Sequence, residues 1–262
     1  MWHNLGQLLR YRGLIQSLVA RDLKARYRGS MLGFFWSFVN PLMLLLIYSF
    51  VFATLLENRT QGIQPYAVFM FTGLLPWTWF QSSMNEATGS LISGGNLIKK
   101  VLFPAEVLPI VTICSNMAHF LLGLPILAIF MIYYGVTPDW IELPWFLVAL
   151  VVQFIFTAAL ALLLSALSVH FRDVKDLVSN LLTFWFFTTP IIYSYQQYPE
   201  YKNYFDLNPF THLAISYQEI LFFDGPFGHK WWLLALGGAS IILFFAAYWI
   251  FDRLRDSFSE AV

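Results

Sequence analysis

The stretch that decides the fold is residues 144–169, PWFLVALVVQFIFTAALALLLSALSV, which contains no charged side chain. A helix of about 20 apolar residues crosses the roughly 30 Å hydrocarbon core of a bilayer. Five further apolar stretches of similar length occur in the chain. The six expected spans are residues 31–55, 66–91, 107–134, 144–169, 177–195 and 231–251. The sequence therefore predicts an all-α integral membrane protein with six transmembrane helices.

The cations of the chain are distributed unevenly between the two sides that six crossings create. Only Arg59, Lys202 and Lys230 fall on one side, and the other side holds the remaining twelve of the fifteen Lys and Arg residues. Those twelve are Arg10, Arg12, Arg21, Lys24, Arg26, Arg28, Lys99, Lys100, Arg172, Lys175, Arg253 and Arg255. Because cations near span ends are retained in the cytoplasm, we expect both termini to be cytoplasmic.

The composition also indicates a membrane protein, because 58% of the residues are hydrophobic and only 11% are charged. No apolar run precedes residue 31, so we expect the first span, rather than a cleaved signal, to direct the chain to a bacterial inner membrane. We expect one membrane domain over 1–262, with an interface segment at 1–30, a bundle at 31–251, an external region at 196–230 and a cytoplasmic tail at 252–262. A single cysteine excludes an intrachain disulfide, and the scattered histidines show no metal-ligand spacing.

Residues 2–28 have the periodicity of an amphipathic helix. The apolar positions are Leu5, Leu8, Tyr11, Ile15 and Leu18. The polar positions are Arg10, Ser17, Arg21, Lys24 and Arg28. Such a helix lies along the cytoplasmic face of the membrane, either as a lipid anchor or as a docking surface for a partner protein.

The loop of residues 92–106 combines a glycine turn and two lysines with an unusually apolar patch. The apolar residues are Leu97, Ile98, Val101, Leu102 and Phe103. A solvated connector would leave these side chains in water, so we expect a short helix here. Burial of its apolar face against another protein is favoured over contact with lipid.

Two other segments carry polar or helix-breaking signals. The second span becomes polar toward its cytoplasmic end, where Glu86 is either a functional carboxylate or a group at the headgroup level. The external region 196–230 is too long for a hairpin, and its apolar run is too short to span. We expect one or two short helices at the outer surface, beginning near Asn208–Pro209 and ending at Asp224–Gly225–Pro226.

The sequence excludes several chemistries. Gly89 and Gly94 have the spacing of a phosphate-binding loop, but Gly95–Asn96 follow where Lys and Ser or Thr are required. The spans hold few ionisable groups, which disfavours an ion-coupled carrier. No paired acids or metal-binding acidic motif occur, so we expect no catalytic residue and no metal site.

Aromatic residues are abundant, with 27 Phe, 13 Tyr and 10 Trp. Most are expected to form belts at the membrane interfaces. Rings that face a pore could stack on the C–H faces of sugars and still let a glycan slide. The candidates are Phe34, Phe35, Trp36, Phe38, Phe184, Trp185, Phe186 and Phe187.

Three motifs carry a family resemblance. The first is Arg21-Asp-Leu-Lys-Ala-Arg-Tyr-Arg28 with Leu32–Gly33, Trp36 and Asn40-Pro-Leu42, and the others are Phe103-Pro-Ala-Glu-Val-Leu-Pro109 and Phe171-Arg-Asp-Val174. With these motifs the chain resembles, from about residue 8 to 255, the membrane subunit of bacterial ABC-type polysaccharide exporters. O-antigen exporter permeases are the most similar members, and teichoic-acid exporter permeases are related.

The resemblance implies a homodimer that encloses a channel for lipid-linked polysaccharide, with a separate cytoplasmic ATPase subunit that binds ATP and magnesium. It implies docking on that ATPase through Arg21, Asp22, Lys24, Arg26, Arg28, Leu97, Ile98, Lys99, Lys100, Val101, Leu102, Phe103, Pro104 and Glu106. It implies an external gate at Asn208, Pro209, Tyr217, Gln218 and Glu219. Relatives often have an arginine near Gln218, and this chain does not. A drug or small lipid as cargo, or a scaffold for glycan synthesis, remain the alternatives.

Overall fold

The computed structural model describes residues 10–51, 63–99 and 103–261. These residues form helices and connecting turns, and no strand occurs among them. The longer helices are α2 (Arg12–Arg26), α3 (Trp36–Ser49), α4 (Tyr66–Thr88), α7 (Val107–Tyr134), α8 (Pro144–His170), α9 (Val174–Thr188), α11 (Pro209–Leu221) and α12 (Lys230–Ala261). The short helices are α5 (Ser90–Ser93), α6 (Gly95–Ile98) and α10 (Lys202–Leu207).

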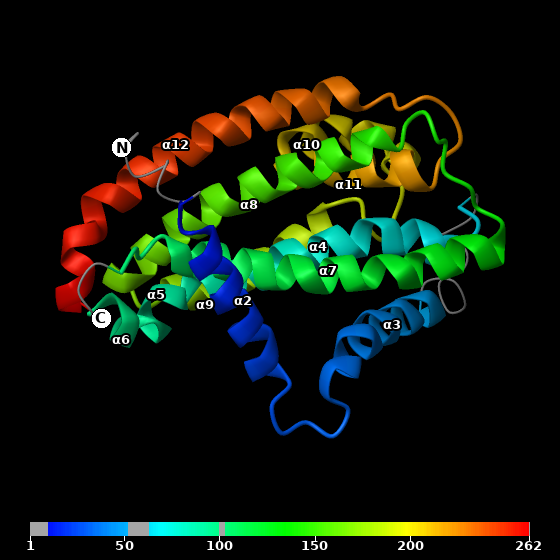
Figure 1. Cartoon of the computed structure of the whole chain (residues 1–262). Helices are drawn as coiled ribbons and strands as arrows, with labels where there is room; N and C mark the ends of the chain where they lie inside the picture. Colours follow the sequence, from blue (N-terminus) through cyan, green and yellow to red (C-terminus); the bar gives the residue numbers. More distant parts are fainter. Residues whose placement is uncertain (1–9, 52–62, 100–102, 262) are drawn as a thin grey trace.

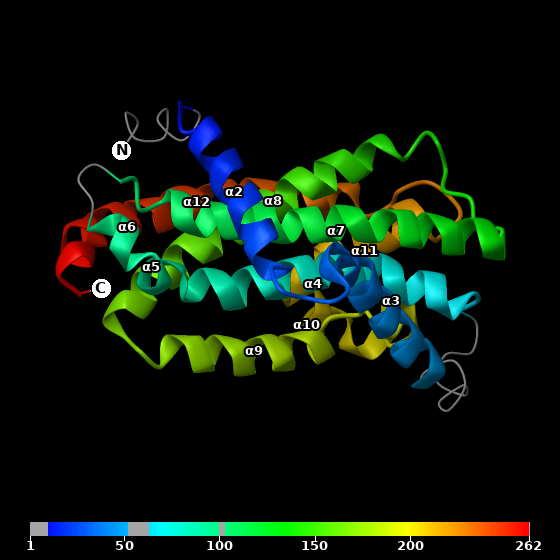
Figure 2. The same ribbon diagram turned by 60° about the horizontal axis from the view of Figure 1, so that its bottom comes forward.

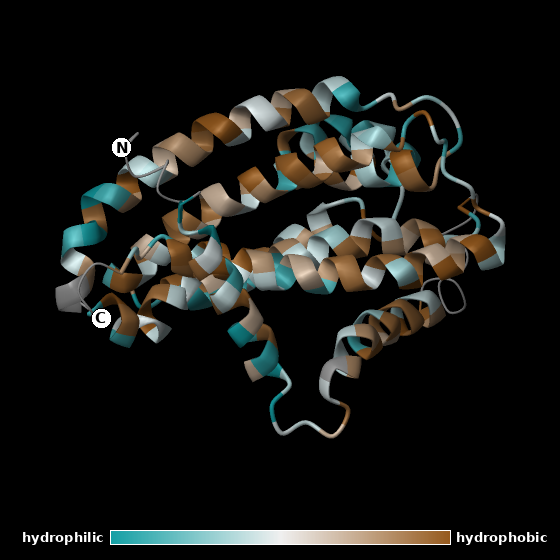
Figure 3. Cartoon of the chain, viewed as in Figure 1, coloured by the Kyte–Doolittle hydropathy of each residue, from teal (hydrophilic) through white to brown (hydrophobic). Residues whose placement is uncertain are grey.

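Three helices within the described residues are long and apolar enough to cross a bilayer: α7, α8 and α12. They coincide with the third, fourth and sixth expected spans. α4 has 23 residues but a more polar sequence, whereas α3 and α9 have 14 and 15 residues. The first expected span also continues beyond residue 51, where the described residues stop. Figure 3 places the apolar residues along the bundle and many of the polar ones on α2 and the last turns of α12.

Helix α4 forms the centre of the bundle. It packs against α3, α7, α8, α9 and α11, and most of its side chains are buried. Pro76 interrupts its hydrogen-bond ladder. The Gln153 amide of α8 donates to the Pro76 carbonyl at 2.8 Å, so the chain itself satisfies a polar group at this proline.

Helices α8 and α12 pack along each other. Their close approach depends on Gly237, because a Cβ atom there would lie 3.1 Å from Val152 Cγ2. Figures 1 and 2 show α2, α5, α6, the start of α9 and the end of α12 toward one end of the bundle. The loop 135–143, α10 and α11 lie at the other end.

The two helices of the external region differ in burial. α11 begins at Pro209 with Asn208 as its N-cap and ends before Asp224, as predicted. Helix α10 is mostly exposed, as a surface helix should be. α11 instead packs among α4, α8 and α12 with eleven of its thirteen residues buried, and its place at the outer membrane surface stays a prediction. Its apolar run is too short to span a bilayer but long enough to fill the bundle interior.

Candidate functional site

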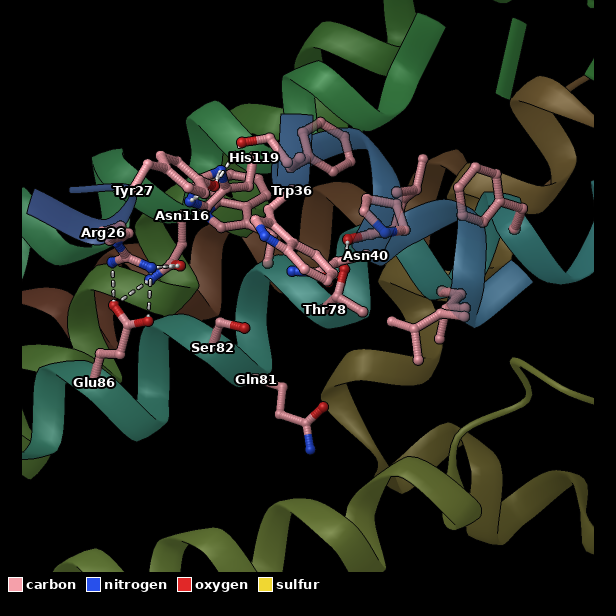
Figure 4. A pocket seen from close by; sticks show the side chains of 18 residues that line it. Arg26, Tyr27, Trp36, Asn40, Thr78, Gln81, Ser82, Glu86, Asn116 and His119 are labelled. Atoms are coloured by element: carbon pink, nitrogen blue, oxygen red, sulfur yellow. Dashed lines mark hydrogen bonds and ion pairs between the residues drawn. The ribbon is translucent and has the colours of Figure 1, made fainter. Parts of the chain in front are cut away.

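The most connected polar site joins helix α2 to helices α4 and α7 (Figure 4). Arg26 Nη1 donates to Glu86 Oε1 at 2.9 Å, and Arg26 Nη2 forms a second, shorter contact with Glu86 Oε2. The Asn116 amide donates to Glu86 Oε2 at 2.9 Å and its oxygen accepts from Arg26 Nη1 at 3.2 Å. Asp22, one turn before Arg26, adds an ion pair at 3.1 Å. Residues far apart in sequence thus form one bidentate, charge-assisted cluster.

Tyr27 provides a second attachment in the same region. Its hydroxyl lies 2.5 Å from Ser37 Oγ and 3.4 Å from each ring nitrogen of His119. Gly29 and Gly33 connect α2 to α3 with φ values of +80° and +50°, a conformation that side-chain-bearing residues rarely adopt. The α2–α3 hairpin is therefore tied to α7 at its turn by polar contacts.

A cavity of about 440 Å³ lies between this hairpin and the α4–α7 pair. Arg26, Glu86 and Asn116 line one end, and Figure 4 shows Trp36, Asn40, Thr78, Gln81 and Ser82 further along. Glu86, whose location the sequence left open, therefore faces this cavity and a cation from α2.

A second, larger cleft of about 820 Å³ lies between α2 and the α5–α6 segment. Arg21, Asp22, Leu97 and Lys175 are among its lining residues. Arg21, Lys24, Arg28 and Lys99 are exposed toward this end of the bundle. Lys100, Val101 and Leu102 lie outside the described residues. The cleft brings the basic residues of α2 and the apolar loop to one surface.

Several residues of the loop 92–106, which we expect to dock on the ATPase, contact other parts of the same chain. Phe103 packs with the apolar patch formed by α2 and α7 around Leu18 and Val111. Ile98 packs on a second cluster that contains residues of α8 and α12. Pro104 is buried as well. Ile98 and Phe103 are half-buried by these contacts, and their contact with a partner stays a prediction.

Glu106 is also internal. Its carboxylate is buried, and Oε2 lies 3.5 Å from Arg255 Nη2 of α12. A buried carboxylate requires such a cationic partner. In this structure Glu106 stabilises the junction of the loop with α12, and its side chain is not presented to a partner.

The aromatic candidates separate into two groups. Phe35, Trp36, Phe184 and Phe187 are exposed, and Trp36 lines the 440 Å³ cavity. Phe38 is half-buried, and the side chain of Phe34 is outside the described part. Phe186 is buried against Trp77 and Tyr48, and Trp185 packs on Phe80. Phe186 therefore faces the core of the chain in this conformation, and the channel role of these residues stays a prediction.

The expected gate residues hold α11 inside the bundle. The Asn208 oxygen accepts from Trp185 Nε1 at 2.6 Å and caps α11 by accepting from Phe210 N at 3.0 Å. Gln218, which is buried, donates to the Pro190 carbonyl at 2.8 Å. Pro209 occupies the first turn of α11, and Tyr217 is fully buried. Gln218 thus acts as a fixed structural contact in this conformation.

Glu219 and two histidines form a polar cluster beside these residues. Backbone N–H groups of Gly228 and His229 donate to Glu219 at 3.0 and 2.9 Å, but burial still raises the pKa of this carboxyl. His229 lies 2.9 Å from a ring nitrogen of His212. Burial, with the neighbouring His212, lowers the pKa of His229 to about 4.

Sequence reasoning missed the pairing of these groups. Glu86, Asn116 and His119 stand out as the rare polar side chains of apolar spans, but nothing local indicates that α2 supplies their partners. The His212–His229 contact and the role of Arg255 also depend on tertiary packing. Within the described residues, no group of His, Cys, Asp and Glu could hold a metal ion.

Three long apolar helices around a buried central helix define a multi-pass membrane protein. A family model described as ABC-2 type transporter matches residues 13–222, and the chain belongs to this family. It is 40% identical over 259 residues to the O-antigen export system permease protein RfbA of Myxococcus xanthus, covering 98% of both chains. It is 35% identical over 264 residues to an RfbA of Klebsiella pneumoniae, covering 99% of this chain and 98% of the relative. It is 25% identical to the capsule polysaccharide export inner-membrane protein CtrC of Neisseria meningitidis, covering 68% of this chain and 66% of the relative.

Proposed function

We propose that the chain is the transmembrane subunit of an ATP-driven exporter that moves lipid-linked polysaccharide of the O-antigen type from cytoplasm to periplasm. The observation that carries this proposal is the similarity to O-antigen export permeases over nearly the whole length of both chains. The similarity to capsule export proteins is weaker and covers about two thirds of each chain. An O-antigen type of cargo is therefore favoured over a capsular one.

The topology that we propose has six spans, with α3, α4 and α9 joining α7, α8 and α12. The basic end of the bundle faces the cytoplasm together with both termini, because cations near span ends are retained there. One domain then covers 1–262, and residues 252–262 form its cytoplasmic tail. Helix α2 lies at the cytoplasmic interface, with its apolar side against α7 and its exposed cations toward a partner or lipid headgroups.

The partners are a second copy of the chain and a separate cytoplasmic ATPase, which binds ATP and magnesium. Exposed apolar side chains on α3 and α9, such as Leu46, Ile47, Leu181 and Phe184, would contact the second copy or lipid. The 820 Å³ cleft provides a concave surface for the ATPase, with Arg21 and Lys24 of α2 nearby and Leu97 in its lining. Exposed charges set the position of such a contact, and buried apolar anchors supply most of its free energy.

The mechanism that we propose begins with movement of α2 on closure of the ATPase. The Arg26–Glu86–Asn116 cluster transmits this movement to α4 and α7, because a bidentate pair resists sliding more than an apolar contact does. The outer gate at α11 then opens through rearrangement of the Asn208 and Gln218 contacts. Exposed aromatic rings of α3 and α9 line the resulting path.

The deciding experiment reconstitutes the chain with its partner ATPase in lipid vesicles. Lipid-linked polysaccharide should cross the bilayer on addition of ATP and magnesium, and neither protein alone should move it. Transfer of a drug or a small lipid but no glycan would instead identify another cargo. An ATPase whose turnover does not respond to this chain would favour a scaffold.

A further inference from the structure

The cavity between α3 and the α4–α7 pair is lined by many residues besides the Arg26–Glu86–Asn116 cluster. The proposed transmission of α2 movement does not require these residues. Its volume of about 440 Å³ falls in the range of small-molecule binding sites. It extends from the Arg26–Glu86 pair along α4 to Thr78 and Leu75, and Trp36 and Asn40 of α3 form the opposite wall (Figure 4). Its lining combines charged, amide and hydroxyl side chains with aliphatic and aromatic ones, as the binding site of an amphipathic ligand would.

The charges that line the cavity are already compensated. Arg26 is paired with both Glu86 and Asp22, so no cation remains for a phosphate or carboxylate. A hydrocarbon ligand also fits poorly, because it would leave amides and hydroxyls without partners. Among the described residues, the side chains of Asn40 and Ser82 have no hydrogen-bond partner, although both line the cavity. The lining therefore favours a neutral ligand with many hydroxyl groups.

Aromatic rings complete this chemistry. Trp36 lines the cavity and is 38% exposed, whereas Phe71, Trp79 and Phe120 of the same lining are almost fully buried, so the ring available for stacking is that of Trp36. Ring faces pack against the apolar C–H side of a sugar ring, and amides and hydroxyls can donate to and accept from its O–H groups.

We propose that this cavity binds one or two sugar units of the glycan, so that each subunit holds a carbohydrate site of its own. The proposal deepens the function proposed above and rests on it. The α2–α3 hairpin forms one wall, and Tyr27 ties its turn to Ser37 and His119. Movement of α2 therefore changes the width of the cavity. Closure of the ATPase would in this way change the affinity of the cavity for the glycan.

The test measures protection of an engineered thiol by the glycan. Ser82→Cys reports on the cavity and Thr183→Cys reports on the exposed face of α9, both in a Cys114→Ala background. The complex with the ATPase is placed in lipid nanodiscs and labelled with a small methanethiosulfonate reagent. The probe is the polysaccharide purified from the producing cells and released from its lipid by mild acid.

The cavity site predicts that labelling of Ser82→Cys slows roughly tenfold when the glycan is at about ten times its Kd, because only the free site reacts. Protection of Thr183→Cys alone would overturn the cavity site and leave polysaccharide export intact. Protection of neither thiol, with ATP-driven glycan transfer still present in vesicles, would also overturn only the cavity site. Loss of both protection and transfer would remove the proposed function as well.

A second variant separates binding from folding. Asn40→Ala should raise the glycan concentration needed for half protection of Ser82→Cys by about twofold to tenfold, the range for one lost hydrogen bond. Leu46→Ala is the matched control, because Leu46 is exposed on the same helix and does not line the cavity. Equal half-protection concentrations in the two variants would contradict the proposed contact with Asn40.

Discussion

The Arg26–Glu86 pair is the contact on which the proposed coupling depends, and a double-mutant cycle tests it directly. The perturbations are Arg26→Ala, Glu86→Ala and the double variant. The pair is bidentate, and its side chains are 24% and 39% exposed. It is therefore neither a solvated surface pair nor a fully buried one.

The magnitude follows from this intermediate burial. Exposed ion pairs contribute about 0–1 kcal/mol, whereas removal of one partner of a buried pair costs about 3–5 kcal/mol. In Arg26→Ala the Glu86 carboxylate would keep the Asn116 amide as a donor at 2.9 Å, which limits the penalty. We expect each single variant to lose about 1–3 kcal/mol and the coupling energy to be about 1–2 kcal/mol.

Two measurements are made on each variant of the double-mutant cycle. Thermal unfolding of the purified chain in nanodiscs should show a decrease of roughly 2–4 °C for each kcal/mol lost. Stimulation of the partner ATPase by glycan should also decrease in both single variants, because α2 no longer moves α4. Arg21→Ala is the control for the unfolding measurement only, since Arg21 is exposed and has no ion pair among the described residues. Asp22→Ala should cost only the roughly 0.3–0.5 kcal/mol of an i,i+4 pair.

A specific result would refute this reasoning. If the coupling energy is below about 0.5 kcal/mol, the pair behaves as a solvated surface contact and transmits nothing. If ATPase stimulation by glycan is unchanged in both single variants while unfolding temperatures decrease, the pair is structural only. Either result would move the coupling to the α5–α6 loop.

Three other predictions concern the docking loop, the gate and the external histidine. Phe103→Ala should reduce export more than Lys99→Ala in the reconstituted vesicles, because Phe103 anchors the loop on α2 and Lys99 is exposed, and equal export would reject this ranking. Asn208→Ala should lower the free energy of unfolding by about 1–2 kcal/mol through loss of the N-cap and the Trp185 contact, and an unchanged melting temperature would exclude that role. The pKa of His229 is about 4 instead of 6.5, so between these values the unfolded chain binds a proton that the folded chain does not. Stability should therefore fall by about 1–3 kcal/mol as pH falls through that window, and melting curves of His229→Gln should show a smaller decrease.

The sequence was sufficient for features that depend on local composition. The positions of α7, α8 and α12 follow from runs of apolar residues long enough to cross hydrocarbon. The start of α11 follows from an Asn–Pro pair, because asparagine caps a helix and proline suits its first turn.

The inward faces of the helices could not be predicted from the sequence. In a membrane, the side of a helix that faces lipid is as apolar as the side that faces the core, so periodicity does not distinguish them. The sequence therefore could not place Phe186 in the core, Phe103 on α2 or Glu106 beside Arg255. The burial of α11 in the bundle could not be predicted for the same reason. Arg26 and Glu86 were both candidates, but their partnership depends on the crossing of two helices 60 residues apart.

The contacts that attach α2 to the bundle explain why closure of the ATPase could move this helix. Helices α8 and α12 pack along each other, and separating them would expose a large apolar surface. Helix α2 is held by a small apolar patch around Leu18, by Ile15 against the main core, and by polar contacts through Arg26 and Tyr27. Polar contacts can exchange partners over a short displacement, whereas a packed apolar interface must separate. A force applied at α2 would therefore shift the hairpin and the cavity wall before it disturbed the α8–α12 core.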